Sequence, residues 1–414
     1  MKSTLIAILV LAVVGTTVYF SVQYFSSLTT PLQILSELNP RNAPKANLSQ
    51  TIPTTLTSAI LEVPENMRTG AFATDRILRA PKGVSISVYA SGMQKPRLLA
   101  FSPAGVPFVT DMDAGTVYAM PDPNGDGSAD RLVPFATGLS KPHGIAFRKD
   151  EVLLAEERNV RVLRDTNGDL IADENRIIID DLPTGGSHVT RTMAIDSEGS
   201  LYVSVGSSCN VCKDDGRRAA ILRFKADGSD EVLFARGTRN AVGLAWKPGT
   251  DELWATDNGR DFLGDDLPPD EVNVLKENGD YGWPRCYGKS IADTSQKGSE
   301  AECPGTLPSR IDLQAHSAPL GLRFVPESSA LAKNIPGQLL IAYHGSWNRR
   351  EPTGYKVVVA DISGAEPVVR DLITGWYANG DVWGRPVDVA FAPDGSLFIT
   401  DDKAGAVYRV TTPE

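Results

Sequence analysis

Histidine is scarce in this chain, and each of its four copies lies among small residues that are typical of loops. The four are His143, His188, His316 and His344. A neutral imidazole takes up a proton near neutral pH, so a loop histidine is suited to act as a catalytic base. We expect at least one of the four to be such a base, and a purely structural histidine is the alternative at each position.

The richest acidic string runs over residues 257–273, where several carboxylates are separated by Gly and Pro. A cation or arginine would relieve the mutual repulsion of these acids. Around a common mouth, arginines would hold a carboxylated ligand by bidentate pairing, whereas surface ion pairing is the alternative. The arginines near this string in sequence, or expected near it in space, are Arg191, Arg239, Arg260, Arg349, Arg350 and Arg385.

Two shorter strings, residues 122–130 and 165–173, share the pattern Asp-x-Asn-Gly-Asp-x-x-x-Asp. Alternating oxygen side chains around a glycine turn suit a hard cation such as Ca²⁺. Neither string has the bidentate glutamate that completes an EF-hand loop. A turn that repeats between strands is therefore the alternative to a calcium site.

The four cysteines fall into a Cys209-x-x-Cys212 motif and a wider pair, Cys286 and Cys303. In an oxidising compartment the simplest pairing is 209–212 and 286–303, although three connectivities are possible. Lys213 follows the motif where c-type haem attachment needs histidine, so that chemistry is disfavoured. A zinc site with four thiolates is a weaker alternative, because the wider pair lacks the usual spacing.

These residues need elements that position them, and the elements recur along the chain. Six copies of an apolar pair, a turn with Pro, Gly or Asp, and an alternating strand end in an acid or polar residue. The second apolar residues of the copies are Phe101, Phe147, Ile195, Trp246, Phe324 and Phe391. The spacing of the first four copies suits a four-stranded unit, and the two longer intervals indicate insertions in the fourth and fifth units.

Six such units predict an all-β fold, a six-bladed β-propeller, because the faces of neighbouring blades bury one another. A β-sandwich with chance similarity is the alternative. The ring would bring loops that are distant in sequence to one end, and the insertions after residue 257 and within 280–320 would build walls over that end.

The N-terminal region predicts export. Residues 4–25 carry no charge, are mostly apolar and would extend roughly 33 Å as a helix, enough to cross a bilayer core. Lys2 precedes them, so the amino end should remain inside. We expect a transmembrane or signal helix over 1–25, with a retained anchor favoured over a cleaved signal because residues 21–26 make a poor cleavage site. A linker over 26–80, whose later part would pack on the domain, and the propeller over 81–414 follow, on the periplasmic side of the inner membrane or free in the periplasm.

Composition narrows the partners. The chain has 414 residues and a formal net charge of −10. An acidic surface argues against nucleic acid as a partner, because phosphate binding needs a basic surface. The charge is compatible with a small neutral substrate and bound cations.

At residues 83–411 the chain resembles the glucose/sorbosone dehydrogenase family, six-bladed propellers that use pyrroloquinoline quinone (PQQ), and it is most similar to the sorbosone-dehydrogenase-like branch. Four segments carry the resemblance. They are Gly-Gly-Ser-His188 with Arg191, Gly-Thr-Arg239-Asn240, Asn258-Gly259-Arg260 with Asp270-Glu271-Val-Asn273 and Tyr281-Gly-Trp-Pro, and Trp-Gly-Arg385-Pro-Val-Asp388.

The resemblance implies an oxidoreductase that oxidises an aldose or sugar aldehyde by hydride transfer to PQQ. It gives His188 the role of base and Arg239, with Asn240, the task of supporting charge on the quinone oxygen. The carbonyls of Gly259 and Arg260 would bind a Ca²⁺ that also grips the cofactor.

Other roles follow from the same resemblance. Arg385 would pair with a cofactor carboxylate, and Arg191 would also lie at the cofactor. Asp270, Glu271 and Tyr281 match positions that hold structural calcium in some relatives. The electron acceptor would be a quinone or a cytochrome.

Three departures concern the substrate more than the cofactor. Ser207 stands where glucose-oxidising relatives have aspartate, and Val387 replaces a second arginine. The cofactor lysine has no clear match, and His344, Arg349 or Arg350 would substitute for it. The alternatives to the dehydrogenase are a calcium-dependent lactonase on a similar propeller, for which no matching glutamate and asparagine set is found, and a non-enzymatic binding module.

Overall fold

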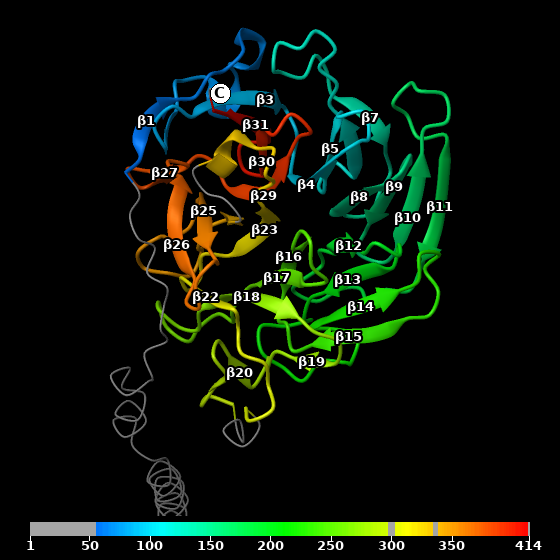
Figure 1. Cartoon of the computed structure of the whole chain (residues 1–414), viewed down its shortest axis with the longest axis vertical. Coiled ribbons are helices and arrows are strands. Elements are labelled where there is room, and N and C mark those ends of the chain that lie inside the picture. The colour runs from blue at the N-terminus through cyan, green and yellow to red at the C-terminus, as the bar shows by residue number, and fades with distance from the viewer. Residues whose placement is uncertain (1–54, 297–302, 334–337, 413–414) are drawn as a thin grey trace, which may run out of the picture. The chain divides into compact units, whose positions relative to one another are not determined.

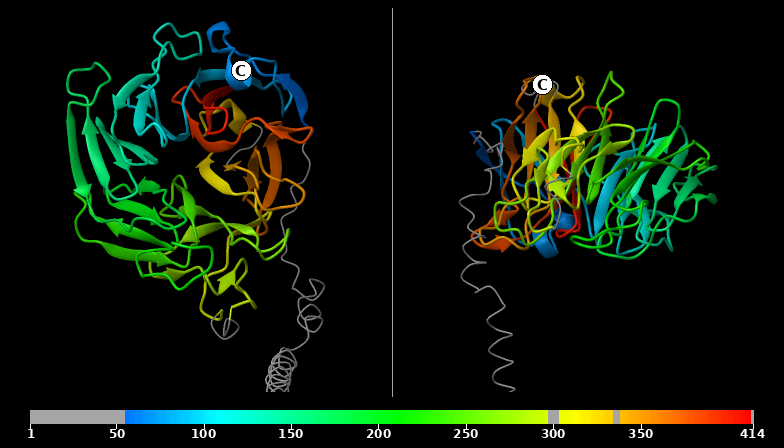
Figure 2. Two further views of the ribbon diagram at one scale, coloured as in Figure 1. Left: turned by 180° about the vertical axis from the view of Figure 1, so that it is seen from behind. Right: turned by 90° about the horizontal axis from the view of Figure 1, so that it is seen from below.

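The computed structural model describes residues 55–296, 303–333 and 338–412. Six sheets stand around an axis as the blades of a propeller (Figure 1), and each has four antiparallel strands, to which the third sheet adds a short fifth. Figure 2 shows the same ring from behind and edge-on. The six-bladed, all-β fold expected from the repeats is confirmed.

Each blade is named from its inner strand outwards. The first has β4 (Pro96–Phe101), β5 (Pro107–Asp111), β6 (Thr116–Ala119) and β7 (Val133–Ala136). The second has β8 (Gly144–Arg148), β9 (Glu151–Ala155), β10 (Val160–Arg164) and β11 (Glu174–Ile179). The third has β12 (Met193–Ile195), β13 (Leu201–Val205), β14 (Ala220–Phe224) and β15 (Val232–Arg236), with β19 (Gly279–Asp280) added in parallel.

The fourth blade has β16 (Ala241–Trp246), β17 (Leu253–Asp257), β18 (Asp270–Leu275) and β22 (Ile311–Leu313). The fifth has β23 (Pro319–Phe324), β24 (Leu339–Tyr343), β25 (Lys356–Asp361) and β26 (Val368–Ile373). The sixth has β29 (Pro386–Phe391), β30 (Leu397–Asp401), β31 (Ala406–Thr411) and, outermost, β3 (Ser85–Ser91).

The ring is closed by the two ends of the propeller sequence. β3 pairs antiparallel with β31, from Ser85 opposite Thr411 to Ser91 opposite Ala406. A strand from the start of the domain therefore completes the last blade, so that no blade leaves an unpaired gap in the ring.

The repeated hairpins are the inner two strands of each blade, and a Thr-Asp pair at the end of the second strand fixes three of them. Thr110, Thr256 and Thr400 donate hydroxyl hydrogen bonds to carbonyls of the next blade, those of His143, Leu320 and Arg97. The aspartate that follows each threonine accepts backbone N–H groups from the loop that leads into its own inner strand. This pair ties neighbouring blades together and shapes the loops at one end of the ring.

The two predicted insertions are present. In the fourth blade, residues 276–310 include β19 and a short hairpin of β20 (Cys286–Tyr287) and β21 (Ile291–Ala292). Before the sixth blade, β27 (Tyr377–Ala378) and β28 (Asp381–Val382) form another hairpin. Among the described residues the helices are single turns, at Glu65–Met67, Gly70–Phe72 and Ala330–Lys333.

The segment expected as a linker over 26–80, with its later part packing on the domain, is described from residue 55 onward. Strands β1 (Thr57–Ile60) and β2 (Ile77–Ala80) form an antiparallel ribbon. Arg79 of this ribbon forms an isolated β-bridge with Thr374 of the ring. Phe72 is buried edge-on against Trp383 and Tyr408. This part of the segment buries apolar side chains in the core of the ring and is not a free tether.

The expected membrane or signal helix at residues 1–25 lies outside the described residues. Within residues 55–296, 303–333 and 338–412, no helix is long and apolar enough to cross a membrane.

The cysteines pair as Cys209–Cys212 and Cys286–Cys303, as the simplest pairing predicted. No thiolate is left for the alternative zinc site among the described residues. Two disulfides are typical of an exported protein, because an oxidising compartment is needed to keep them.

Candidate active site

The candidate site lies at the end of the ring where the inner strands begin. Because the two inner strands of a blade are antiparallel, the loop before the first and the loop after the second meet at this end. His188 precedes β12, Arg239 and Asn240 precede β16, Arg385 precedes β29, and Gly259 follows β17. These sequence-predicted residues from three blades therefore lie at one rim.

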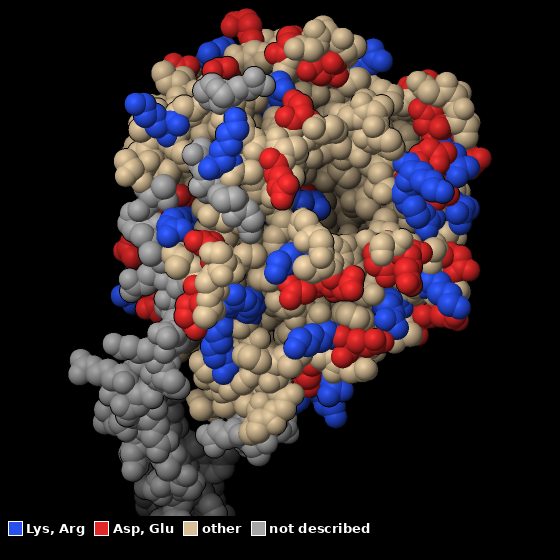
Figure 3. All heavy atoms as spheres, viewed as in Figure 1, with Lys and Arg blue, Asp and Glu red and all other residues tan. Residues whose placement is uncertain are grey.

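Along the axis, the ring encloses a cavity of about 230 Å³. Figure 3 shows a hollow at the centre of the face in view, with acidic and basic side chains around it. Each inner strand contributes to the lining of the cavity, with Leu98, Ile145, Met193, Leu244, Leu322 and Asp388.

His188 is oriented by Ser207, the residue that follows β13 by two positions. Its Nδ1 atom lies 2.9 Å from the carbonyl oxygen of Ser207 and 2.9 Å from the hydroxyl of the same residue. A carbonyl only accepts, so Nδ1 carries the proton and Nε2 is left as the basic nitrogen. Burial, and then the positive charge of Arg239, lower the pKa of His188 to about 4. The histidine is therefore neutral near pH 7 and able to accept a proton.

Arg191 is placed behind the histidine and not on the rim. Its side chain is completely buried, and its guanidinium donates to the carbonyls of His188, Thr190 and Pro183. Burial lowers its pKa to about 10. These donors hold the backbone of the histidine loop, and Nε has no hydrogen-bond partner among the described residues. The contact of Arg191 with a cofactor stays a prediction.

Arg239 is fixed by its backbone and by its side chain. Asp257 accepts the backbone N–H groups of Arg239 and Asn240, at 2.9 and 2.6 Å. The guanidinium donates to both the carbonyl and the side-chain oxygen of Asn210, at 3.1 and 2.9 Å, and forms an ion pair with Asp261 at 3.1 Å. A further bond runs to the carbonyl of Asn258. These contacts hold the guanidinium of Arg239 in a single orientation beside His188.

Gly206 lets the histidine and Asn240 approach each other. A Cβ atom at this position would lie 2.6 Å from the Cβ of His188 and 2.7 Å from Oδ1 of Asn240. Any side chain there would push the two residues apart. The structure thus brings His188, Arg239 and Asn240 together, as the sequence predicted.

The acidic region is arranged around a small cavity of about 20 Å³, roughly the size of one water or ion. The cavity is lined by Asp257, Glu271, Gly259 and Arg260, among others. Burial raises the pKa of Asp257 to about 7, and burial together with the charge of Asp257 raises the pKa of Glu271 to about 8. Asn273 donates to Glu271 while its own Oδ1 has no hydrogen-bond partner among the described residues. Carboxylate and amide oxygens such as those of Asp257, Glu271 and Asn273 are ligands that a hard cation prefers.

Two of the expected metal ligands have other partners. Both oxygens of Asp270 accept backbone N–H groups, from Gly259 at 2.8 Å and Ala318 at 2.9 Å. The phenol of Tyr281 donates to the carbonyl of Val274. The side chains of Asp270 and Tyr281 therefore hold loops. Asp257, which the sequence did not single out as a ligand, lines the cavity and likewise accepts two backbone N–H groups, those of Arg239 and Asn240.

Across the described residues, no group of three or more His, Cys, Asp and Glu side chains is arranged to hold a metal. The two Asp-x-Asn-Gly-Asp strings are self-bonded turns. In the first, Asp122 accepts the N–H groups of Gly125 and Gly127, and in the second, Asp165 accepts those of Gly168 and Leu170. The turn alternative is thus what the structure displays at both strings.

Arg260 and Arg349 also make ion pairs. Arg260 is paired with the buried Asp293 at 2.7 Å, and Arg349 with Asp266 at 2.9 Å. Their guanidinium groups are therefore used within the insertion loops at the rim, and only the backbone of Arg260 remains available to the cavity.

Arg385 belongs to a second polar group at the rim. Its guanidinium donates to the carbonyls of His344 and Gly345, at 3.0 and 2.6 Å, and lies over the ring of Tyr355. Within the part of the chain that the structure describes, no carboxylate pairs with Arg385. His344 donates through Nε2 to the carboxylate of Asp402 at 2.8 Å, and Asp402 is also paired with Arg97 at 2.6 Å.

Sequence reasoning missed Asn210 and Asn348, which complete the site together with Asp261 of the acidic string. Asp261 accepts from Arg239 and, at 2.7 Å, from Asn348 of the fifth blade. Asn210 lies inside the Cys-x-x-Cys motif, whose cysteine spacing indicates redox or metal chemistry and not a partner for an arginine. The motif's position directly after Ser207 was the one available signal that it belongs to the site.

The fold is a six-bladed propeller like that of PQQ-dependent sugar dehydrogenases. The chain belongs to the TrAA12-like family, whose model matches residues 78–413. The family resemblance inferred from the sequence is confirmed.

Relatives and solved structures agree with this assignment. The chain is 30% identical over 354 residues to an uncharacterized protein of Borreliella burgdorferi, covering 80% of this chain and 90% of that protein. It is 22% identical over 396 residues to a pyrroloquinoline quinone-dependent sugar dehydrogenase of Hypocrea jecorina, covering 80% and 88%.

Two solved structures share the fold. A calcium structure of a Trichoderma reesei enzyme of Carbohydrate-Active Enzymes family AA12 superposes with a TM-score of 0.71 at 22% identity, covering 81% of this chain and 96% of that one. The holo PQQ domain of the pyranose dehydrogenase of Coprinopsis cinerea superposes with a TM-score of 0.69 at 21% identity, covering 85% and 98%.

Proposed function

We propose that this protein is a PQQ- and calcium-dependent dehydrogenase that oxidises an aldose or sugar aldehyde. One observation carries the proposal. His188, a neutral histidine whose Nδ1 is bonded to Ser207, lies close enough to the cation of Arg239 for that charge to lower its pKa. A sugar hydroxyl gives up a proton during such an oxidation, and a positioned neutral imidazole accepts it.

The residues of the rim have different roles in the reaction. His188 takes the proton from the substrate hydroxyl at Nε2. Arg239 and Asn240 stabilise the negative charge that develops on the acceptor oxygen, because their N–H groups are already oriented before the reaction. When bound, PQQ supplies the quinone that accepts a hydride from the sugar carbon.

PQQ carries carboxylates, and the rim fits that chemistry at Arg385. This guanidinium contacts carbonyls and an aromatic ring but forms no ion pair among the described residues. A cofactor carboxylate would complete its hydrogen bonding by a charge-assisted pair. His344 and Arg349 lie in the loop between β24 and β25 and would support the far side of the cofactor.

Calcium fits the small cavity between Asp257 and Glu271. Two buried carboxyl groups with raised pKa values repel each other, and a divalent cation relieves that repulsion. The backbone carbonyls of Gly259 and Arg260 would provide additional oxygen ligands. The cation would also neutralise charge beside the cofactor.

We further propose an exported location, on the periplasmic side of a membrane, held by the apolar segment at residues 4–25. The two disulfides support export. The electron acceptor would be a quinone or a cytochrome, and the acidic surface argues against nucleic acid as a partner.

Reconstitution tests the proposal. The purified full-length chain is loaded with PQQ and Ca²⁺, and reduction of an artificial electron acceptor dye is measured with a panel of aldoses and sugar aldehydes. We expect dye reduction that depends on PQQ, on Ca²⁺ and on at least one sugar. Tight binding of PQQ without turnover of any sugar would contradict the substrate class, and absence of PQQ binding would contradict the cofactor.

A further inference from the structure

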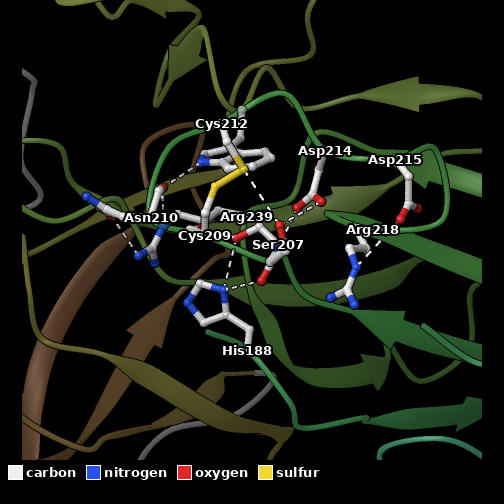
Figure 4. The surroundings of a disulfide bond; sticks show 11 residues. His188, Ser207, Cys209, Asn210, Cys212, Asp214, Asp215, Arg218 and Arg239 are labelled. Atoms are coloured by element: carbon white, nitrogen blue, oxygen red, sulfur yellow. Dashed lines mark hydrogen bonds and ion pairs between the residues drawn. A yellow bond between two sulfur atoms is a disulfide. The ribbon is translucent and has the colours of Figure 1, made fainter. Parts of the chain in front are cut away.

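The loop after β13 links the two halves of the candidate site. It runs from Ser207 to Asp214 and is closed by the Cys209–Cys212 disulfide (Figure 4). The proposed base, His188, lies at one end of this loop, and Arg239 lies beside its middle (Figure 4).

Asn210, inside the disulfide, supplies two of the acceptors of Arg239. Its carbonyl accepts from Nε, and its side-chain oxygen accepts from a terminal nitrogen. The same side chain accepts the backbone N–H of Asp261 at 2.8 Å and donates to the carbonyl of Asp261 at 3.2 Å. The side chain of Asn210 thus joins the arginine to the loop that carries the arginine's other partner, Asp261.

The other end of the loop reaches the histidine. The hydroxyl of Ser207 donates to the carbonyl of Cys209 at 2.7 Å, and the same hydroxyl lies 2.9 Å from Nδ1 of His188. The carbonyl of Cys209 therefore sets the direction of the serine hydroxyl, and its position depends on the adjacent disulfide.

The loop is held on its outer side as well. Asp214 accepts both the backbone N–H and the hydroxyl of Ser208, at 2.6 and 2.9 Å. The indole of Trp283 donates to the carbonyl of Asn210 at 3.2 Å. This carbonyl therefore receives two donors, from Trp283 and from Arg239, and can serve both only while the loop keeps one conformation.

We propose that Asn210, locked in place by the Cys209–Cys212 disulfide, is a positioning residue that sets the orientation of Arg239 and, through Ser207, of His188. The effect on turnover rests on the proposed function, whereas the effect on the orientation of Arg239 does not. The disulfide closes only a short loop, and chain entropy gives such a bond less global stabilisation than a long loop receives. Its main effect is therefore local.

The first test needs no cofactor. In the full-length chain without PQQ, the signal of the Arg239 Nη–H that donates to the Asn210 side chain and the indole N–H signal of Trp283 are recorded by ¹⁵N NMR. In Asn210→Ala, which removes its acceptor, we expect the Arg239 signal to shift and to exchange faster with water. In the Cys209→Ser/Cys212→Ser double variant, which releases the loop, we expect both signals to do so. Val211→Ala, in the same loop but without a polar side chain, is the matched control and should leave both signals in place.

The second test measures turnover in the PQQ-loaded protein. We expect kcat to fall about tenfold to a hundredfold in Asn210→Ala and in the cysteine double variant, as for a misplaced catalytic group, while KM for the sugar changes little. Asn210→Asp keeps the side-chain acceptor for Arg239, so it should recover part of the lost kcat.

The two tests separate the two claims. If the wild-type chain fails to turn over sugar, the proposed function falls, and the NMR test still decides the positioning role. If Asn210→Ala, which keeps the disulfide, leaves the Arg239 signal unchanged, the positioning role is wrong whatever happens to kcat.

Discussion

The imidazole of His188 faces Ser207 through Nδ1, at 2.9 Å from the serine carbonyl. This contact fixes the tautomer, since the carbonyl cannot donate, and it directs Nε2 away from the backbone. Ser207, which follows the hairpin of β12 and β13, therefore affects the chemistry of His188, which precedes this hairpin. The chemistry proposed for the rim depends on this tautomer.

Loss of the base should abolish turnover without loss of the cofactor. We expect His188→Gln to lower kcat about 10²- to 10⁴-fold, the usual contribution of a general base, while PQQ affinity measured by titration stays within a few fold. His316→Gln, in the loop between β22 and β23, is the control and should keep wild-type kcat. Wild-type kcat in His188→Gln would contradict the assignment of the base.

The pH profile should reflect the low pKa of His188. Its pKa of about 4 means that the base is neutral above about pH 5, so kcat/KM should be flat from there to neutral pH and fall only in more acidic solution. Removal of the nearby positive charge in Arg239→Gln favours the protonated imidazole. The acidic limb should therefore move to higher pH in that variant, and movement to lower pH would be inconsistent with the geometry.

Calcium should stabilise the fold through the buried cavity. At a concentration of 100 Kd, binding to the folded state alone adds about 2.7 kcal/mol to the free energy of unfolding. We expect Ca²⁺ to raise the midpoint of thermal unfolding of the wild type and of Asp126→Asn, a change in a surface turn, but to have little effect on Glu271→Gln. An equal response in Glu271→Gln would place the ion elsewhere.

Chelated protein should lose stability as the pH rises. The pKa values of Asp257 and Glu271, about 7 and 8, lie above those of an unfolded chain, so folding favours their protonated forms. Their contribution is fully present below about pH 4 and declines as the pH rises towards 8. Chemical denaturation at pH 6 and pH 8.5 measures this decline, and added Ca²⁺ should remove most of it. An equal free energy of unfolding at the two pH values without calcium would show that folding does not raise the pKa values of these two acids.

The second disulfide should matter for stability. Cys286–Cys303 closes a longer loop than Cys209–Cys212, and chain entropy predicts a contribution of about 3 kcal/mol. Cys286→Ser/Cys303→Ser should lower the free energy of unfolding in urea by about this amount, and a change below about 0.5 kcal/mol would mean that the insertion is held by other contacts.

The sequence predicted the blades because each hairpin repeats an apolar pattern, and such patterns follow local rules. It also predicted that His188, Arg239, Asn240 and Arg385 meet at one rim, because every copy enters the ring in the same direction. The closing strand β3 was not predicted, since its partner β31 lies at the other end of the domain and its pairing depends on long-range contacts.

Side-chain partners were harder to predict than side-chain locations. Arg191, Asp270 and Tyr281 lie near the expected site, but backbone groups use their polar atoms. The type of a residue does not reveal which hydrogen-bond partner its side chain will meet. Asp257 was visible as the acidic end of a repeat, and only the fold shows that it clamps the arginine loop and lines the cavity.

The most direct test of the account is the absorbance spectrum of PQQ bound to the full-length chain, recorded without oxygen before and after addition of a sugar that supports dye reduction. The account predicts that the wild type converts its bound quinone to the reduced form, whereas His188→Gln binds an equal amount of PQQ and leaves it oxidised. Equal reduction in both proteins, or no PQQ bound to either, would contradict it.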